Sequence, residues 1–303
     1  MSHGVPQRIL VGWRPESAGT EALHYAAWLA RTGPVTIRVA TVIPRTWPMV
    51  LSVLSGFDTW AKEEADRSAA AARAALKEAG VPKSALDDEP TVAVTGTSEA
   101  AGLSTAATDF DADLIILGSH GSAAKGYFRM GSTADALLHY SPIPIGLAPR
   151  HPKLSKRGIT RICCPYVDTA QSHTALARAA DMAMAWDLPL RLLAFVPSGA
   201  AFSPVDAPMG NDSNLMVEWQ EQAMATLDRG RDRALTRYPD IHLETEIGSG
   251  PNWAAALDTV KWKKGDLLVT GSSALGPFAR VFIGSSTSQI LRHCPTPIYV
   301  TPA

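Results

Sequence analysis

The chain of 303 residues is poor in the side chains that build disulfide frameworks and metal sites. It has three cysteines, two of them adjacent at Cys163 and Cys164, and this arrangement makes neither a disulfide framework nor a metal-ligand spacing. Neighbouring residues of a strand point to opposite faces, so we expect this pair to be separate, buried packing residues. The eight histidines are scattered without the paired spacing of a zinc site. The sequence therefore predicts no metal centre.

Strong net charge and long hydrophobic runs are also missing. The formal net charge is −1, which gives no reason to expect nucleic acid or an anionic membrane surface as the main partner. No apolar run reaches the roughly 18 residues of a membrane span, and residues 1–8 contain no apolar core of a signal peptide. We therefore expect a soluble, cytoplasmic protein.

Motifs of the common nucleotide-hydrolysing and acyl-transfer enzymes are absent as well. No G-x-x-x-x-G-K-[ST] segment occurs, which argues against a fast P-loop NTPase, and no G-x-S-x-G elbow is present. His120 follows a serine but has no partner carboxylate at a recognisable spacing. We therefore assign no catalytic residue and expect, at most, slow hydrolysis of ATP.

One glycine pattern is present and informative. Gly118-Ser119-His120-Gly121 follows the apolar run at residues 114–117, and nine residues later comes Gly131-Ser132-Thr133. A buried strand that leads through glycines into a helix start presents unpaired backbone N–H groups, and the helix dipole favours an anion there. The pattern predicts a phosphate site that suits a nucleotide. The alternative is that the glycines serve only the geometry of the turn and the helix start.

The same pattern returns 153 residues further along, at Gly271 and at Gly284-Ser285. This offset also relates Ile9-Leu10-Val11 to Ile162-Cys163-Cys164, which indicates an internal duplication. Two domains of about 150 residues match ordinary domain size. We place them at residues 1–150 and 158–303, joined by a polar, basic linker.

The second copy of the pattern has Ala274 where the first has Gly121. If that position needs a positive φ, a side chain costs about 1–2 kcal/mol, and its methyl group also hinders the close approach of a phosphate. The second site is therefore expected to be weak or empty. Gly271, Gly284 and Ser285 would then keep mainly turn and helix-start geometry.

Strands and helices alternate in each half, which implies a parallel sheet with helices on both faces. We expect strands at 9–12, 35–43, 91–95, 114–117 and 143–148, and helices at 19–31 and 61–79; the second half should have strands at 162–165, 190–196, 242–247, 267–270 and 298–301, and helices at 172–186 and 215–238. Prolines flank the last strand of each half, which confines it to an edge. An open edge invites pairing, so we expect the two last strands to pair within the molecule. A second copy of the chain could also associate with the first to form a homodimer.

The repeat, the G-x-x-G-x9-G-[ST] spacing and the closing Pro-x-Pro-[IV] strand together resemble the universal stress protein family over nearly all of both halves. The resemblance implies two tandem flavodoxin-like or Rossmann-like α/β domains, each with a five-stranded parallel sheet of order 3-2-1-4-5. It implies ATP binding, with or without Mg²⁺, in a regulatory protein of the stress-response type. It assigns phosphate and ribose contacts to Gly118, Gly121, Gly131, Ser132 and Thr133, and the base wall to Gly12, Trp13 and the strand around Val42 at residues 41–43. Arg14, next to Trp13, is a further candidate for the nucleotide site.

The chain departs from the family at the end of its first strand. The family pattern has an aspartate there, whereas this chain has Arg14, and Val167 in the second half. Arg14 could reach toward the phosphates as a charged donor or fill the base pocket. Trp13 could stack on a purine or simply pack. Asp168, next to Val167, is expected to face elsewhere.

Two functional hypotheses follow. In the first, the chain is a regulatory protein that holds an adenine nucleotide in its first half. In the second, it is a nucleotide-free scaffold whose pocket is filled by Arg14 and Trp13. Its apolar loops at 44–60 and 197–219 would then bind a protein, although these loops could also cover a pocket or pack on their own helices.

Overall fold

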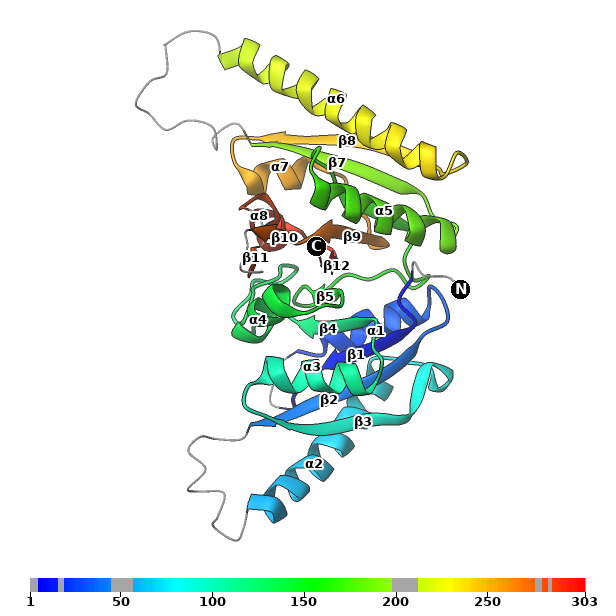
Figure 1. Ribbon diagram of the computed structural model, residues 1–303, viewed down its shortest axis with the longest axis vertical. Helices are drawn as coiled ribbons and strands as arrows, with labels where there is room; N and C mark the ends of the chain where they lie inside the picture. Colours follow the sequence, from blue (N-terminus) through cyan, green and yellow to red (C-terminus); the bar gives the residue numbers. More distant parts are fainter. Residues whose placement is uncertain are drawn as a thin grey trace, which may run out of the picture.

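The computed structural model describes residues 5–15, 19–44, 57–197, 212–275, 280–282 and 285–302. Ten of the strands in these ranges form one sheet that runs the length of the molecule, in the order β3-β2-β1-β4-β5-β12-β9-β6-β7-β8 (Figure 1). The elements of the first half are β1 (Arg8–Gly12), α1 (Glu21–Ala30), β2 (Thr36–Pro44), α2 (Phe57–Glu78), a short 3-10 helix (Lys83–Ala85), β3 (Leu86–Gly96), α3 (Glu99–Asp109), β4 (Leu114–Gly118), α4 (Ser132–Tyr140) and β5 (Ile145–Ala148).

The second half repeats this order. Its elements are β6 (Arg161–Pro165), α5 (Ala170–Ala185), β7 (Leu190–Pro197), α6 (Asp212–Arg237), β8 (Leu243–Gly250), α7 (Trp253–Thr259), β9 (Asp266–Gly271), β10 (Ser273–Leu275), β11 (Arg280–Phe282), α8 (Ser285–His293) and β12 (Ile298–Thr301). All strands and helices expected from the sequence are present. The hairpin of β10 and β11 has no counterpart among the described residues of the first half and was not expected.

Each half has the strand order 3-2-1-4-5, and the two last strands pair with each other. β5 and β12 run antiparallel, with Ile145 opposite Val300 and Leu147 opposite Ile298. Tyr25 also reaches across, because its hydroxyl lies 3.4 Å from the carbonyl oxygen of Ile298. The predicted pairing of the last strands is thus confirmed, and it removes both edges from solvent.

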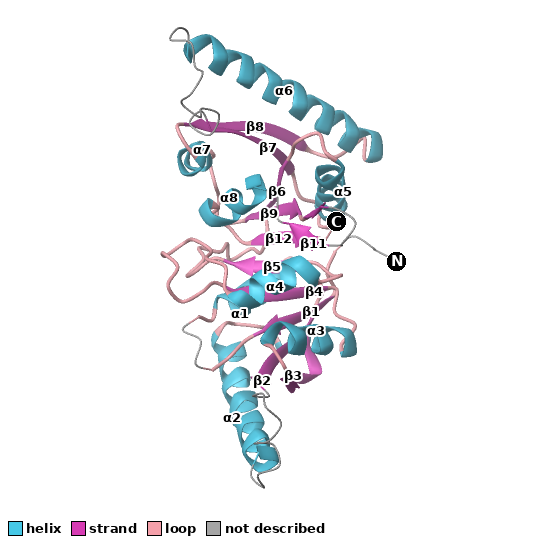
Figure 2. Ribbon diagram, turned by 60° about the vertical axis from the view of Figure 1, so that its left-hand side comes forward, coloured by secondary structure: helices cyan, strands magenta, loops and turns pink. Residues whose placement is uncertain are grey.

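Helices cover both faces of the sheet (Figure 2). One buried cluster lies under α1, α2, α5 and α6, and a second lies under α3, α4, α7 and α8; both clusters contain residues of the two halves. The halves therefore share continuous cores on either side of the sheet. No described helix has the length and apolar character needed to cross a membrane.

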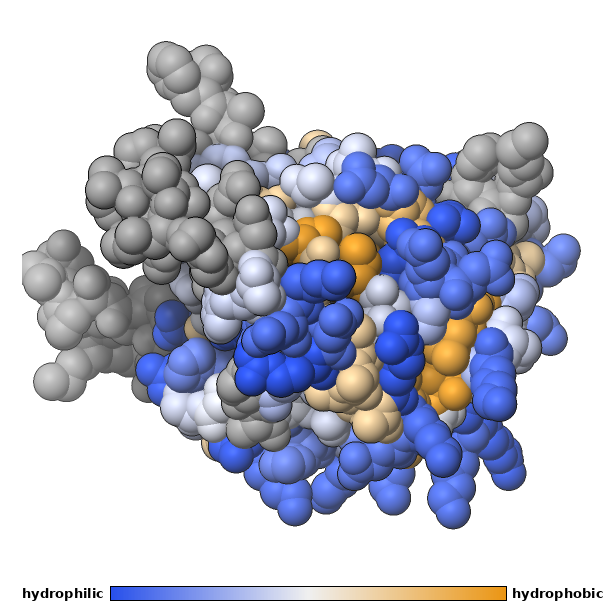
Figure 3. All heavy atoms as spheres, turned by 90° about the horizontal axis from the view of Figure 1, so that it is seen from below, coloured by the Kyte–Doolittle hydropathy of each residue, from blue (hydrophilic) through white to orange (hydrophobic). Residues whose placement is uncertain are grey.

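The outer strand β3 ends the sheet in the first half. Its first residues after Leu86 are Asp87, Asp88, Glu89 and Pro90, which discourage further strand pairing. Seen from this end of the molecule, hydrophilic side chains surround smaller apolar patches (Figure 3). The loops at 44–60 and 197–219 lie mostly outside the described residues, so their predicted role as a lid or docking surface stays a prediction.

Candidate functional site

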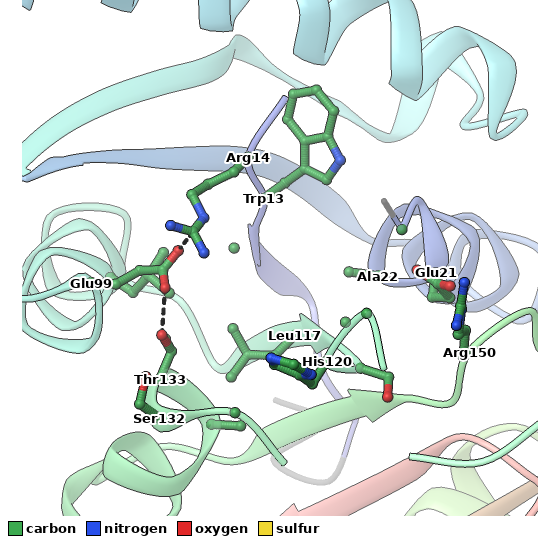
Figure 4. Close-up of a pocket in the computed structure, with 18 of the residues that line it drawn as sticks. Trp13, Arg14, Glu21, Ala22, Glu99, Leu117, His120, Ser132, Thr133 and Arg150 are labelled. Carbon is green, nitrogen blue, oxygen red and sulfur yellow. Dashed lines mark hydrogen bonds and ion pairs between the residues drawn. The ribbon is translucent and has the colours of Figure 1, made fainter. Parts of the chain in front are cut away.

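A cavity of about 590 Å³ opens at the carboxyl ends of β1 and β4. These two strands are parallel neighbours, but β1 leads to α1 on one face of the sheet and β4 leads to α4 on the other. Loops that leave neighbouring strands in opposite directions open a crevice, which is where ligands bind in doubly wound α/β sheets. We call this cavity the first-half cleft (Figure 4).

Most of the residues assigned from the sequence meet in this cleft. The assigned residues that line it are Gly12, Trp13, Arg14, Gly118, Gly121, Gly131, Ser132 and Thr133. Val42 is not among the lining residues. Its side chain is buried beneath α3, where a Cβ placed on Gly102 would approach Val42 Cγ1 to 2.7 Å. The side chain of Val42 therefore packs in the core and does not form a wall of the cleft.

The glycines of the cleft keep space open. A Cβ placed on Gly121 would meet no atom within 4 Å, and one on Gly131 would come no closer than 3.8 Å to His120. Neither residue has a positive φ. Neither packing nor backbone conformation therefore requires glycine at these two positions. Because Gly121 does not have a positive φ, the expectation that its counterpart Ala274 would be strained is not supported. What a side chain would change is the room left for a ligand.

The start of α4 lies at the rim of the cleft. Gly131 is its N-cap residue and provides no side-chain bond to the free N–H groups of the first turn. In α3, by contrast, the hydroxyl of Ser98 accepts a hydrogen bond from the N–H of Ala101. An uncapped helix start beside a cavity can give its N–H groups to an anion.

The loop between β4 and α4 is held by its own hydrogen bonds. The N–H of Arg129 donates to Ser119 Oγ at 2.8 Å, and the N–H of Ser122 donates to His120 Nδ1 at 3.3 Å. Because a backbone N–H can only donate, the Nδ1 atom accepts, which leaves the proton of a neutral ring on Nε2. Arg129 and Lys125 are not among the lining residues, but Arg129 Nη1 donates at 2.9 Å to the hydroxyl of Ser122, which lines the cleft.

Arg14 lines the cleft and pairs with a carboxylate there. Its Nε lies 3.1 Å from Glu99 Oε1, and the hydroxyl of Thr133 donates to Glu99 Oε2. These contacts join the end of β1 to the starts of α3 and α4, along one side of the cleft (Figure 4). Trp13 is 9% exposed and packs with the core under α1 and α2. The cavity remains open beside both side chains.

Glu99, Glu21 and Arg150 line the cleft but were missed by the sequence reasoning. Glu21 is 4% exposed, with Oε1 accepting from the N–H of His151 at 3.3 Å, and Oε2 has no hydrogen-bond partner among the described residues. Arg150 donates to the carbonyl oxygen of Ala123 at 3.0 Å. The only sequence signal for the two acids is their place in the first turn of a helix, where carboxylates are common.

In the second half, the glycine that matches Gly118 is closely packed against a helix. A Cβ placed on Gly271 would approach the carbonyl oxygen of Gln171 to 2.9 Å, because α5 begins at Ala170, one turn earlier than α1 begins in the repeat. Ala274 lies in the β10–β11 hairpin, opposite Val281. Ser285 begins α8, and Gly284 lies outside the described residues. Gly271 is thus required by packing.

Asp168 turns away from the position of the second site, as expected. Its carboxylate bonds to His173 Nε2 and to Arg229 Nε, both at 2.9 Å. The hydrogen bond from His173 is the main cause that holds the pKa of Asp168 below its usual value; desolvation opposes it, and the charge of Arg229 adds to it. Asp168 therefore ties β6 to α5 and α6, while Val167 is 55% exposed.

Comparisons with known proteins agree with this architecture. The family model described as the universal stress protein family matches residues 6–148 and again 158–302. A universal stress protein of Mycobacterium tuberculosis (strain ATCC 25618 / H37Rv) is 31% identical over 299 residues, which cover 97% of this chain and 99% of that protein. A universal stress protein from Archaeoglobus fulgidus DSM 4304 has a similar structure, with a TM-score of 0.62 at 18% identity over 97% of this chain and 98% of that one.

Proposed function

Because the chain belongs to the universal stress protein family, we propose that it is a cytoplasmic regulatory protein that binds an adenine nucleotide such as ATP in the first-half cleft. The observation that carries the proposal is the open rim of glycines beside the uncapped start of α4. Backbone N–H groups without neighbouring side chains suit a phosphate. The second half then serves as the structural partner of the first.

The position of the nucleotide follows from the walls of the cleft. The phosphate would lie between Gly118, Gly121 and Ser132, where glycines and the helix start meet. The base would lie toward Gly12 and Trp13, because the wall there is formed by the end of β1 and by the apolar side chains Leu103 and Leu117. An apolar slot with a few polar groups at one end is the usual form of a small-molecule site.

Isothermal titration calorimetry tests the proposal. Wild-type protein is titrated with ATP, ADP and AMP, with and without Mg²⁺, and heat of binding to one site per chain is expected for at least one of them. Gly121→Leu should weaken binding at least tenfold while the protein keeps its melting temperature, because the new side chain enters open space. Ala124→Leu is the matched control, since Ala124 is exposed in the same loop but does not line the cleft.

Two negative results together would contradict the binding proposal. If none of the three nucleotides gives a heat and native mass spectrometry of fresh protein finds no retained nucleotide, the binding proposal fails. The nucleotide-free scaffold would then be the better hypothesis.

A further inference from the structure

Glu99 occupies part of the position that an anion would take at the start of α4. Thr133 is the second residue of α4, and its hydroxyl donates to Glu99 Oε2. Glu99 itself is 29% exposed and begins α3, on the opposite wall. A carboxylate already lies, therefore, against one of the groups expected to contact phosphate.

The charged groups of the cleft are balanced. The titratable side chains that line it are Arg14, Arg150, Glu21 and Glu99, together with His120. Arg14 pairs with Glu99, and the buried carboxylate of Glu21 lies beside Gly118, where a Cβ would come within 3.9 Å of Oε2. Among the described residues that line the cleft, two arginines thus face two carboxylates, and one of these carboxylates, Glu99, lies at the start of α4.

The number of phosphates decides how well a nucleotide fits such a cleft. One phosphate monoester carries about 1.5 to 2 negative charges near neutral pH, and a triphosphate carries about twice as many. Like charges a few ångströms apart repel strongly in a partly buried site. In the position proposed above, a single phosphate would lie between Gly118, Gly121 and Ser132, whereas a longer chain would extend toward Thr133, whose hydroxyl donates to Glu99.

We propose that Glu99 makes the first-half cleft selective for a nucleoside monophosphate over the triphosphate. This inference rests on the proposed function and names its ligand class. The contact between Glu99 and Thr133 limits the length of the phosphate chain, and Arg14 holds Glu99 in that position. Glu99 is thus a residue that sets specificity by repulsion.

The test compares AMP, ADP and ATP by calorimetry at one ionic strength without Mg²⁺. Wild-type protein should bind AMP about tenfold more tightly than ATP, the effect expected of one poorly screened like charge. Glu99→Gln keeps an acceptor for Thr133 but removes the charge. It should tighten ATP binding about tenfold and AMP binding less than threefold, so that the preference disappears.

Two controls separate charge in the cleft from general effects. Glu89→Gln removes an exposed carboxylate of β3 and should leave all three affinities unchanged. Addition of Mg²⁺, which neutralises part of the triphosphate, should narrow the difference between AMP and ATP in the wild type only.

The remaining outcomes separate failure of the selectivity from failure of the proposed function. Tighter binding of ATP than of AMP by the wild type would overturn the selectivity while leaving the proposed function intact. An equal gain in affinity for AMP and for ATP in Glu99→Gln would also overturn the selectivity. If no nucleotide binds at all, it is the proposed function that fails, and the inference fails with it.

Discussion

Gly271, the last residue of β9, lies so close to the main chain of Gln171 in α5 that a Cβ on it would approach the carbonyl oxygen to 2.9 Å. Its counterpart Gly118 has only the side chain of Glu21 nearby, at 3.9 Å from the same hypothetical atom. Two glycines that match in the repeat thus have different roles. One allows close packing of a helix on the sheet, and the other leaves room at a cleft.

This difference predicts opposite behaviour of two alanine variants. Gly271→Ala should lower the free energy of unfolding by about 1–3 kcal/mol, because α5 must shift to admit the methyl group. Gly118→Ala should change it by less than about 1 kcal/mol but weaken nucleotide binding. Urea denaturation with calorimetry on both variants checks this, and equal loss of stability in the two would contradict it.

A buried charge cluster gives a second prediction. Asp266 is 0% exposed and accepts hydrogen bonds from Arg161 Nε at 2.9 Å and from Arg191 Nη2 at 3.3 Å. Asp266→Asn removes the charge that two nearly buried guanidinium groups share. Arg191 keeps its ion pair with Glu246 at 2.6 Å and Arg161 its longer one with Glu244 at 3.9 Å, so the substitution should cost about 3 kcal/mol. Asp228→Asn, on the exposed surface of α6, is the control and should cost almost nothing. A small effect of Asp266→Asn in urea denaturation would argue against the cluster.

Asp113 is the counterpart of Asp266 and gives a pH-dependent prediction. Burial raises the pKa of its carboxyl, although the N–H groups of Gln7 and Arg8 partly oppose the shift. The ionised form is therefore penalised in the folded state, and the stability associated with this group is lost as the pH rises through its folded pKa. Asp113→Asn replaces one of the two oxygens that accept from these N–H groups, which costs stability at every pH, but relative to the wild type the variant should gain stability between pH 4 and pH 7. Denaturation curves at pH 4 and pH 7 that show the same difference would refute this.

The three cysteines should be unreactive in the folded protein. All are buried, and burial raises the pKa of Cys163 to about 12 and that of Cys294 to about 11, and it raises the pKa of Cys164 as well. Since the thiolate is the reactive form, iodoacetamide at pH 8 should label none of them until the protein is unfolded. Mass spectrometry after a short exposure measures this. Rapid labelling of any cysteine in the native state would show that its site opens.

Local sequence patterns were sufficient to predict the repeat, the order of the elements and the buried cysteines. The glycine spacing also indicated Gly118, Gly121 and the start of α4 at Gly131, all of which line the first-half cleft. These inferences rest on periodicity and on chain direction, which are properties of short segments. The family resemblance, and not the spacing, added Gly12 and Trp13. The side-chain position at the end of β1 could not be predicted, because Arg14, which stands where the family has an aspartate, can adopt several positions.

The β10–β11 hairpin and the inward turn of Val42 could not be obtained in this way. The hairpin replaces a loop whose spacing is preserved between the halves, so the spacing alone does not distinguish the two forms. Val42 points toward α3 because of the pleat of β2 and the close approach of Gly102. Both outcomes depend on how neighbouring elements pack.

The sequence by itself determined the duplicated α/β fold and the glycine-bordered helix start, since strand and helix periods and turn residues act over a few positions. Only the tertiary structure decided which charges face one another in the cleft. Glu99 and Thr133 come from the starts of two different helices, and Arg14 from the end of a strand. Side chains so far apart in sequence meet only when the strands that carry those helices lie side by side in one sheet.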